Sequence, residues 1–371
     1  MHNIHIAGTG IWFPDEKISN EELVNSYNSY VDLFNDKNHT KIQEGLLDSM
    51  EYSSVEFVEK ASGIKSRHVI DKEGILDINR MMPRVNNEHE DRLSIHAEVG
   101  IKAAKKAMKQ ASVISSDIDA VIVGSSHSAR NYPAVAIEIQ KELAINGYAY
   151  DMLVGCSSTT FAINNAFSDI ASGLAKTILV INPEISTPAV NFTHRDKHFI
   201  FGDGCAASII QKDSSSKKSF RILDRKLFTQ FSNNIRSNYS YLNRAAIDAK
   251  DNDDLLFHQY GRGVFKDVCP LVAKLISDQL ESNNIDPKDI SKFWLHQANG
   301  KMIRLITSKI LGTDDFDSTI TPMPIINFGN LASVGSLFAF NLDNDLEAGQ
   351  KGVICSFGAG YSVCSLIVEK T

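Results

Sequence analysis

The sequence lacks the features that mark membrane and nucleic-acid-binding proteins. Its 371 residues contain no run of about 18 apolar residues, so no membrane-spanning helix is predicted. The 45 acidic residues outnumber the 38 basic ones, and the formal net charge is −7. This balance argues against nucleic acid as the main partner, because phosphate-binding surfaces need a basic excess. The N-terminal MHNIHIAGTGIWFP has no basic segment, and we expect a first strand there rather than an export signal.

Cysteine is also scarce. The five cysteines are an odd number in a chain without an export signal, which argues against a disulfide framework and predicts a reducing, cytoplasmic compartment. Hydrophobic residues (43%) and charged residues (22%) are present in ordinary globular proportions, so we expect a packed core. At about 150 residues per domain, the length allows two or three domains.

Motifs for common cofactors are missing as well. Gly8-Thr9-Gly10 is followed by Phe13 where a dinucleotide-binding fingerprint has its third glycine. His194 and His198 have a spacing that suits a metal on a helix, but they lie in the charged segment THRDKH without a matching Cys or His cluster. We therefore expect a solvated turn there and no metal site.

What the sequence does contain is an internal repeat. A helical pattern over 94–110 precedes Asp117 and the apolar run AVIVG, and a second over 265–281 precedes Asp289 and KFWLHQ. Asp289 follows Asp117 by 172 residues, and Asn330 follows Cys156 by 174. Each half closes on F-G-x-G and a β-type run, 201–210 and 357–368.

The alternation of strands and helices predicts an α/β layered fold. The polar stretch 212–219 is the natural boundary, which gives an N-terminal half over 1–211 and a C-terminal half over 220–371. An α/β fold can also repeat strand–helix units without being a duplication. The matching order of motifs favours the duplication.

Cys156 is the first candidate for chemistry. It stands between an apolar strand and the start of a helix, where backbone N–H groups and the helix dipole favour an anion. We therefore expect a lowered thiol pKa and a reactive thiolate, although cysteine is as often a small buried hydrophobe. Core positions are expected for the other cysteines, at 205, 269, 355 and 364.

His296 and Asn330 are the other two candidates. His296 follows the apolar run FWL at the carboxyl end of an expected strand, the edge at which α/β sheets bind ligands, although a structural histidine is an open alternative. Asn330 occupies the repeat-equivalent of Cys156, so a two-fold axis would bring both helix N-termini to one site. It can also be an ordinary helix cap.

The segments around these residues resemble the β-ketoacyl-acyl-carrier-protein synthase III family, of thiolase fold. They are GCSSTT at Cys156, HQAN at His296, FGNLASVGS at Asn330 and SFGAGYS near the C-terminus. The resemblance runs over about 4–368 and implies two similar halves stacked in five layers (αβαβα). Segments 228–245 and 264–273 are similar to the β-ketodecanoyl-acyl-carrier-protein synthases, which use a medium-chain acyl-CoA primer.

The resemblance implies a mechanism. The Cys156 thiolate would attack an acyl-CoA, with the oxyanion held by the N–H groups of Cys156 and Ala359. His296 and Asn330 would then stabilise the enolate formed when malonyl carrier protein loses CO2, and the enolate would attack the acyl-enzyme. The resemblance implies a homodimer and no metal or organic redox cofactor.

Further contacts are implied for individual residues. Arg195 matches an arginine that contacts the CoA nucleotide, and Asn299 matches a polar contact near the pantetheine arm. Tyr132 and Phe265 fall at the acyl and entry tunnels. The basic pair Lys301 and Arg304 is expected to dock the acidic carrier protein.

The chain also departs from the family pattern. Phe57 replaces the adenine-stacking tryptophan, Ala61 replaces its neighbouring arginine and Ala359 replaces a glycine. The changes at Phe57 and Ala61 predict a CoA grip that is weaker or differently built, and the change at Ala359 keeps the backbone N–H but narrows the backbone freedom. The role of the polar insertions 27–54 and 71–91 stays open.

Three alternatives remain. The enzyme could acylate its cysteine but condense a different partner, such as a second acyl-CoA or an intermediate of secondary metabolism. A papain-like cysteine hydrolase has Cys, His and Asn in the same order but not the repeat or the cysteine-flanking signature. A catalytically silent subunit would not need to retain all three polar residues.

Overall fold

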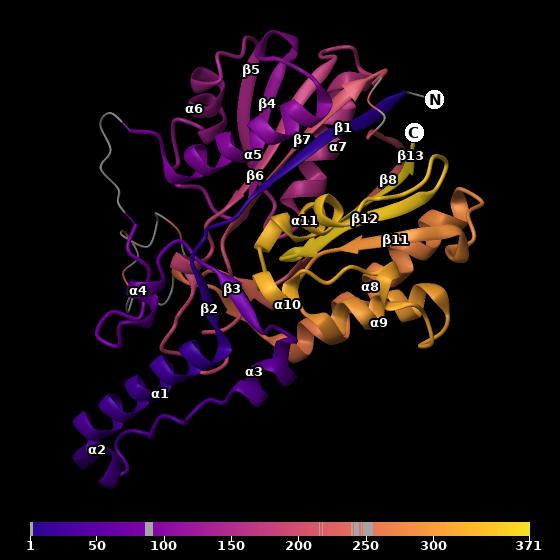
Figure 1. Cartoon of the computed structure of the whole chain (residues 1–371). Coiled ribbons are helices and arrows are strands. Elements are labelled where there is room, and N and C mark those ends of the chain that lie inside the picture. The colour runs from indigo at the N-terminus through magenta and orange to yellow at the C-terminus, as the bar shows by residue number, and fades with distance from the viewer. Residues whose placement is uncertain are drawn as a thin grey trace.

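The computed structural model describes residues 3–85, 92–214, 216, 218–238, 240, 245, 247 and 255–371. Nine strands form the main sheet, in the order β11-β12-β13-β8-β1-β7-β6-β4-β5. Figure 1 shows the early strands on one side and the late strands on the other, meeting where β1 and β8 pair. The strands are β1 (Ile4–Trp12), β4 (Ala120–Ser125), β5 (Tyr148–Leu153), β6 (Thr177–Glu184), β7 (Gly204–Lys212), β8 (Phe220–Ser232), β11 (Ile290–Leu295), β12 (Lys351–Gly358) and β13 (Gly360–Lys370).

The two halves of this sheet repeat one topology. In the N-terminal half, β4 runs parallel to β6, β6 antiparallel to β7, and β7 antiparallel to β1. In the C-terminal half, β11 runs parallel to β12, β12 antiparallel to β13, and β13 antiparallel to β8. Within the described residues, only β5 has no counterpart strand, and the short helix α10 (Ile325–Phe328) stands at the corresponding point of the chain. This correspondence supports the duplication inferred from the sequence.

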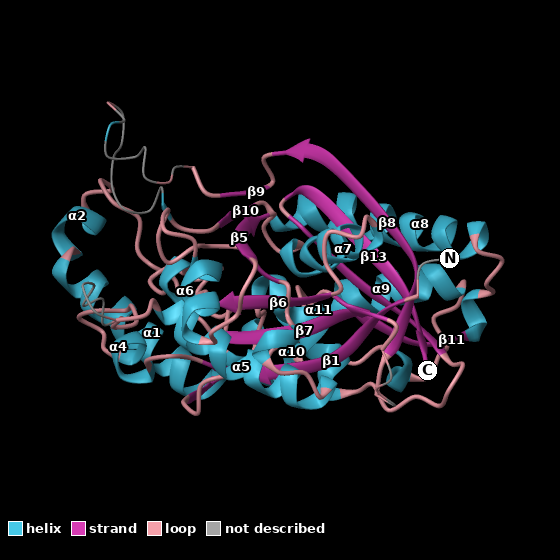
Figure 2. Cartoon of the chain, turned by 90° about the horizontal axis from the view of Figure 1, so that it is seen from above, coloured by secondary structure: helices cyan, strands magenta, loops and turns pink. Residues whose placement is uncertain are grey.

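Helices cover both faces and fill the space between the halves, as the view from above shows (Figure 2). α7 (Ser158–Ala171) and α11 (Gly335–Leu342) share one buried core with both halves of the sheet. A second core lies under α5 (Ile95–Ala111) and α6 (Val135–Glu142). A third lies under α8 (Gly261–Ser282) and α9 (Gly300–Leu311). These three cores give the expected layered thiolase-like architecture, with α7 and α11 in the middle.

Glycines near the N-terminus serve this packing. The face of α5 toward the sheet is rich in alanine, which lets the helix approach β1 closely. A Cβ on Gly10 would lie 2.4 Å from the Ala103 carbonyl oxygen, and one on Gly8 would lie 2.6 Å from the Ala111 nitrogen. The Gly-Thr-Gly segment is therefore a packing feature, in keeping with its incomplete dinucleotide fingerprint.

An arm built from α1 (Asn20–Lys37) and α2 (His39–Gln43) projects from the body (Figure 1). The returning chain is fastened to α1 by two asparagines: the Asn28 side chain bonds both backbone groups of Ser53, and Asn35 does the same with Met50. Most of the insertion 27–54 is thus the outer part of this arm.

The second insertion begins at α4 (Lys72–Leu76) and is fastened by an ion pair. Arg84 donates to both carboxylate oxygens of Asp71, and residues 86–91 lie outside the described residues. The remaining short elements are β2 (Lys17–Ser19), β3 (Ser66–His68), α3 (Val55–Ser62), β9 (Ile235–Arg236) and β10 (His258–Gln259). No helix among the described residues has the length and apolarity needed to cross a bilayer.

Candidate active site

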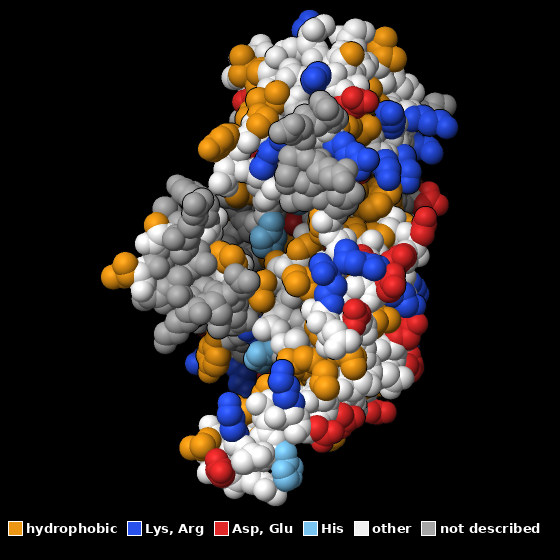
Figure 3. All heavy atoms as spheres, turned by 90° about the vertical axis from the view of Figure 1, so that its left-hand side faces the viewer, with side chains coloured by type: hydrophobic (Ala, Val, Ile, Leu, Met, Phe, Trp, Pro, Cys, Tyr) orange, Lys and Arg blue, Asp and Glu red, His pale blue; other side chains and the backbone are white. Residues whose placement is uncertain are grey.

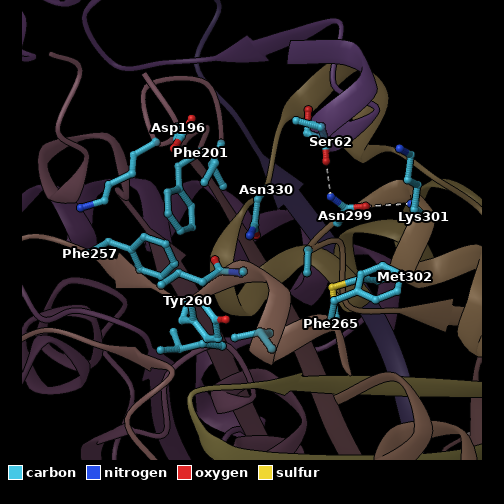
Figure 4. Close-up of a pocket in the computed structure, with 18 of the residues that line it drawn as sticks. Ser62, Asp196, Phe201, Phe257, Tyr260, Phe265, Asn299, Lys301, Met302 and Asn330 are labelled. Carbon is cyan, nitrogen blue, oxygen red and sulfur yellow. Dashed lines mark hydrogen bonds between the residues drawn. The ribbon is translucent and has the colours of Figure 1, made fainter. Parts of the chain in front are cut away.

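A cavity of about 1130 Å³ lies between the two halves and collects the main sequence-predicted residues. Cys156 reaches it from the N-terminal half, and His296 and Asn330 reach it from the C-terminal half. In Figure 4, Asn330 points into the cavity between an aromatic side (Phe201, Phe257 and Tyr260) and a more polar side (Asn299 and Lys301).

Cys156 lies two residues before α7, between β5 and the helix, as the sequence predicts. Its loop packs against the F-G-x-G turn of the other half. A Cβ on Gly358 would lie only 2.5 Å from the Cys156 Cβ, so only glycine permits this approach. The N–H groups of Ala359 and of Cys156 itself face the thiol and favour its anion. These are the two donors expected to form the oxyanion hole.

The predicted lowering of the Cys156 pKa is wrong. Desolvation raises the pKa of this thiol to about 12, and the negative charge of Glu184 raises it further. The two N–H groups and the Ser126 hydroxyl oppose this effect but do not overcome it. Burial therefore outweighs the helix N-terminus, and the resting thiol is protonated.

His296 is buried just after β11, and its backbone N–H donates to the Cys355 carbonyl at 2.8 Å. The ring stands edge-on to Phe357, with centroids 5.2 Å apart. Its Nδ1 is enclosed without a hydrogen-bond partner among the described residues. Desolvation lowers the pKa of His296 to about 3, so the imidazole is neutral at physiological pH.

Asn330 is held by backbone hydrogen bonds to the opposite half. Its backbone N–H donates to the Ile200 carbonyl at 2.9 Å, and its backbone carbonyl accepts the Gly202 N–H at 3.1 Å. Asn330 thus forms an isolated parallel β-bridge with Phe201. The Asn330 Oδ1 accepts the Ala332 N–H at 2.9 Å. This bond orients the amide so that its nitrogen is left for the cavity. Asn330 can therefore bind the backbone of the following turn through its oxygen and contact a ligand through its nitrogen.

Several other predicted residues also line the cavity. Phe57 and Phe265 contribute rings, and Asn299 stands at its polar side. Asn299 Nδ2 donates to the Ala61 carbonyl at 2.7 Å, while its Oδ1 caps α9 by accepting the Lys301 N–H. Ala61, which replaces an arginine of the family pattern, therefore contacts the site through its backbone.

Arg195 lies beside the cavity without lining it. Its guanidinium stacks on Phe57, 4.0 Å from the ring centroid, and its Nε donates to the Tyr52 carbonyl at 2.8 Å. Glu51 and Asp196 carboxylates lie 3.8 and 3.9 Å away. The arm thus orients Arg195, an effect for which the sequence offered no signal.

Tyr132 is not placed at the cavity of its own chain. Its side chain is 84% exposed and is absent from the described lining residues. The loop that carries it follows β4, and the described residues leave this ring largely uncovered. Arg304 is also away from the lining, exposed on α9 and over the ring of Phe316, whereas Lys301 reaches the cavity.

The cavity differs in charge from the whole chain. Its described lining includes four Lys or Arg side chains and one carboxylate: Lys60, Lys197, Arg262, Lys301 and Asp196. A local basic excess therefore surrounds the site of a protein whose net charge is −7. Figure 3 shows one face where lysine and arginine side chains gather beside a recess bordered by hydrophobic ones. Such surroundings favour anionic ligands.

Sequence reasoning missed Glu184 and Ser126. Glu184 ends β6 and Ser126 follows β4, and both lie next to the Cys156 thiol. A signal was available, because three neighbouring strands of one parallel set end at the same sheet edge, where α/β proteins bind ligands. The aromatic wall of Phe257 and Tyr260 was also missed, since it follows a polar segment without periodicity.

Comparison with known proteins agrees with this geometry. Residues 150–230 match the family model "3-Oxoacyl-[acyl-carrier-protein (ACP)] synthase III", and residues 280–370 match its C-terminal counterpart. A β-ketodecanoyl-[acyl-carrier-protein] synthase from Pseudomonas aeruginosa is 47% identical over 348 residues, which are 93% of this chain and 99% of that protein. A β-ketoacyl-[acyl-carrier-protein] synthase III from Campylobacter fetus is 27% identical over 87% of this chain and 92% of its own length.

Solved structures share the fold. The 3-oxoacyl-[acyl-carrier-protein] synthase III of Aquifex aeolicus superposes with a TM-score of 0.74 at 22% identity, and all of both chains is covered. The priming β-ketosynthase of the R1128 polyketide pathway gives 0.77 at 19% identity, covering 100% of this chain and 98% of that one. The chain belongs to the β-ketoacyl-acyl-carrier-protein synthase III family of condensing acyltransferases.

Proposed function

We propose that this protein condenses a medium-chain acyl-CoA with malonyl carrier protein in fatty-acid synthesis, through an acyl-Cys156 intermediate. The observation that carries the proposal is the convergence of Cys156, His296 and Asn330 on one cavity, with the Ala359 N–H beside the sulfur. The similarity to the Pseudomonas β-ketodecanoyl synthase supports the medium chain length. No metal or redox cofactor takes part in this chemistry.

The first step transfers the acyl group. The Cys156 sulfur attacks the thioester carbonyl, and CoA leaves as its thiol. The N–H groups of Cys156 and Ala359 hold the tetrahedral oxyanion; each such donor contributes about 3–4 kcal/mol to transition-state stabilisation. The N–H groups that already favour the thiolate serve the oxyanion as well.

The second step forms the carbon–carbon bond. Malonyl carrier protein loses CO2, and the resulting enolate attacks the acyl-Cys156 carbonyl and expels Cys156 as its thiolate, which then takes up a proton from solvent. His296 and Asn330 donate hydrogen bonds to the enolate oxygen. A neutral His296 suits this role, because a proton on Nε2 can donate to a ligand while the enclosed Nδ1 keeps its lone pair.

Cationic side chains would bind the acidic carrier protein and the CoA nucleotide, which are both anionic. Lys301 at the cavity, together with the exposed Arg304, would dock the acidic carrier protein. Arg195, stacked on Phe57, would contact the CoA nucleotide. The pantetheine arm would pass Asn299, and the acyl chain would lie against aromatic side chains such as Phe265.

A homodimer is part of the proposal. β5 is the edge strand of the nine-stranded sheet, and Leu153 at its end is 57% exposed. An exposed edge strand is a template for pairing with a second copy. The exposed Tyr132 would then belong to the partner's acyl tunnel. Light scattering should give twice the chain mass of 41.0 kDa. We place the enzyme in the cytoplasm, whose reducing conditions suit its five free cysteines.

Mass spectrometry with purified carrier protein tests the function. Octanoyl-CoA should add one octanoyl group to Cys156, and malonyl carrier protein should then yield the β-ketodecanoyl product. Acyl-CoAs of graded length identify the preferred primer. Cys156→Ala is the control and should remain unmodified. Labelling of another residue in the wild type, or a product that does not depend on malonyl carrier protein, would overturn the proposal.

A further inference from the structure

Two polar atoms beside Cys156 are buried without partners. Glu184 is fully buried, and its Oε2 has no hydrogen-bond partner among the described residues. The Ser126 Oγ is likewise enclosed and makes no hydrogen bond of good geometry. Unpaired buried polar groups are rare and costly, so a pair of them at a reactive thiol calls for a function.

The other oxygen of Glu184 is firmly held. Its Oε1 accepts the Ser126 N–H at 2.6 Å, the Ser333 N–H at 3.3 Å and the Ser333 hydroxyl. These bonds fix the carboxylate at the end of β6, with Oε2 left for another donor. The Ser126 side chain stands close enough to act on both Glu184 and Cys156.

We propose that Glu184 accepts the Cys156 thiol proton through the Ser126 hydroxyl during acyl transfer. The thiol proton passes to Ser126 Oγ while the Ser126 proton passes to Glu184 Oε2. The sulfur then bonds to the thioester carbonyl carbon. When the C–S bond to CoA breaks, the CoA sulfur takes a proton back along the same path. Atoms and charge balance, and Glu184 is a positioning and proton-holding residue that acts through Ser126.

The electrostatics of the pocket support this path. Desolvation raises the pKa of Glu184 to about 7, and its negative charge opposes ionisation of Cys156. The two groups therefore share a single negative charge, which rests on Glu184, moves to sulfur as the proton leaves, and passes to the thioester oxygen as the S–C bond forms. The other titratable group that Glu184 acts on among the described residues is the buried thiol of Cys205.

The inference rests on the proposed acyl transfer to Cys156, and rapid-quench measurement of acylation by octanoyl-CoA from pH 5 to 9 tests it. Glu184→Gln keeps the shape of the side chain and one acceptor oxygen but cannot accept a proton. We therefore expect acylation to slow about 100-fold, and the rate to lose the part of its pH profile that rises near neutral pH. Ser126→Ala should slow the same step while its backbone N–H still binds Glu184.

Ser333→Ala is the matched control. It removes a hydroxyl bonded to Glu184 but not the path to Cys156, so the ascending limb should move to higher pH while the maximal rate changes less than in Glu184→Gln. Glu184→Asp should restore part of the pH-dependent rate. Circular dichroism and melting curves check that each variant is folded.

The outcomes separate the two proposals. If the wild type is not acylated at Cys156, the proposed function fails. If the wild type is acylated but folded Glu184→Gln and Ser126→Ala keep the wild-type rate and pH profile, only the proton path is refuted. If Glu184→Gln unfolds, Ser126→Ala decides, since it leaves the carboxylate and its backbone contact in place.

Discussion

The two halves of the molecule place different side chains at equivalent points of one topology. Cys156 precedes α7 in the N-terminal half, and Asn330 precedes α11 in the C-terminal half. Each rests on the F-G-x-G turn of the other half, Cys156 against Gly358 and Asn330 against Gly202. The duplicated fold thus supplies two positions that face one cavity. The sequence places a thiol at one position and a carboxamide at the other.

Burial acts on both halves in one direction, toward uncharged groups. It raises the pKa of Cys156 to about 12 and lowers that of His296 to about 3. The resting thiol is protonated, and the imidazole is neutral. Negative charge on the sulfur and on the substrate oxygens then develops only during the reaction, in a desolvated site where fixed donors stabilise it strongly.

The largest expected effect comes from the turn beneath the nucleophile. Gly358→Ala would push a methyl group to 2.5 Å from the Cys156 Cβ, and the sulfur must move. Because a misplacement of about 1 Å can cost on the order of 100-fold in rate, we expect acylation to fall by that factor. Acyl-enzyme formation from octanoyl-CoA, measured by mass, checks this result.

Gly202→Ala is the matched change in the other half. Its methyl group would lie 2.2 Å from the Phe328 carbonyl oxygen, next to Asn330. In folded protein, condensation should suffer more than acylation. Equal loss of both steps in both variants would contradict the proposed difference between the halves.

Alkylation of the cysteines sharpens the comparison between reactive and core positions. Since the pKa of Cys156 is about 12, its thiolate fraction and its rate with iodoacetamide should rise about tenfold per pH unit between pH 7 and 10. The four core cysteines should remain unmodified in the native protein, because they are at most 1% exposed. Peptide mass mapping gives both rates. An alkylation rate of Cys156 that levels off near pH 7 would instead support the lowered pKa expected from the helix N-terminus.

A smaller effect is expected at the entrance on the N-terminal side. Phe57→Ala removes the ring beneath Arg195, and loss of this cation–π contact, about 1 kcal/mol, should raise the KM for octanoyl-CoA roughly fivefold with kcat little changed. Phe316→Ala is a matched control, since it removes the ring beneath Arg304 on the other half. An equal rise in KM for both variants would refute a role for Phe57 in CoA binding.

The smallest effect is expected for carrier docking on the C-terminal side. Lys301→Ala should raise the KM for malonyl carrier protein about threefold at low salt, and the difference should shrink as salt screens the charge. Lys274→Ala, which removes an exposed lysine paired with Asp278 on α8, is the control. A salt-independent change would indicate a contact other than charge.

The sequence predicted the duplicated α/β fold because both of its signals are local. Apolar runs mark the buried strands, and the order of motifs repeats with a nearly constant offset. The convergence of Cys156 and Asn330 followed from the same repeat, because equivalent positions in two similar halves face each other, whereas His296 was joined to them by the family resemblance.

The remaining features depend on packing and could not be predicted. The prediction of a lowered pKa for Cys156 was wrong because a helix N-terminus can be recognised in the sequence, whereas desolvation cannot. The support of Arg195 by the arm joins segments more than 140 residues apart through a backbone carbonyl, which has no sequence signature. The exposure of Tyr132 depends on a loop whose direction is fixed only in three dimensions.

Separate measurement of the two half-reactions in His296→Ala tests the division of labour most directly. Octanoyl-CoA should still acylate Cys156 in this variant at close to the wild-type rate, while release of CO2 from malonyl carrier protein and formation of the β-ketoacyl product should be lost. Loss of acylation together with condensation in the folded variant would contradict the account, because His296 would then serve the nucleophile of the other half.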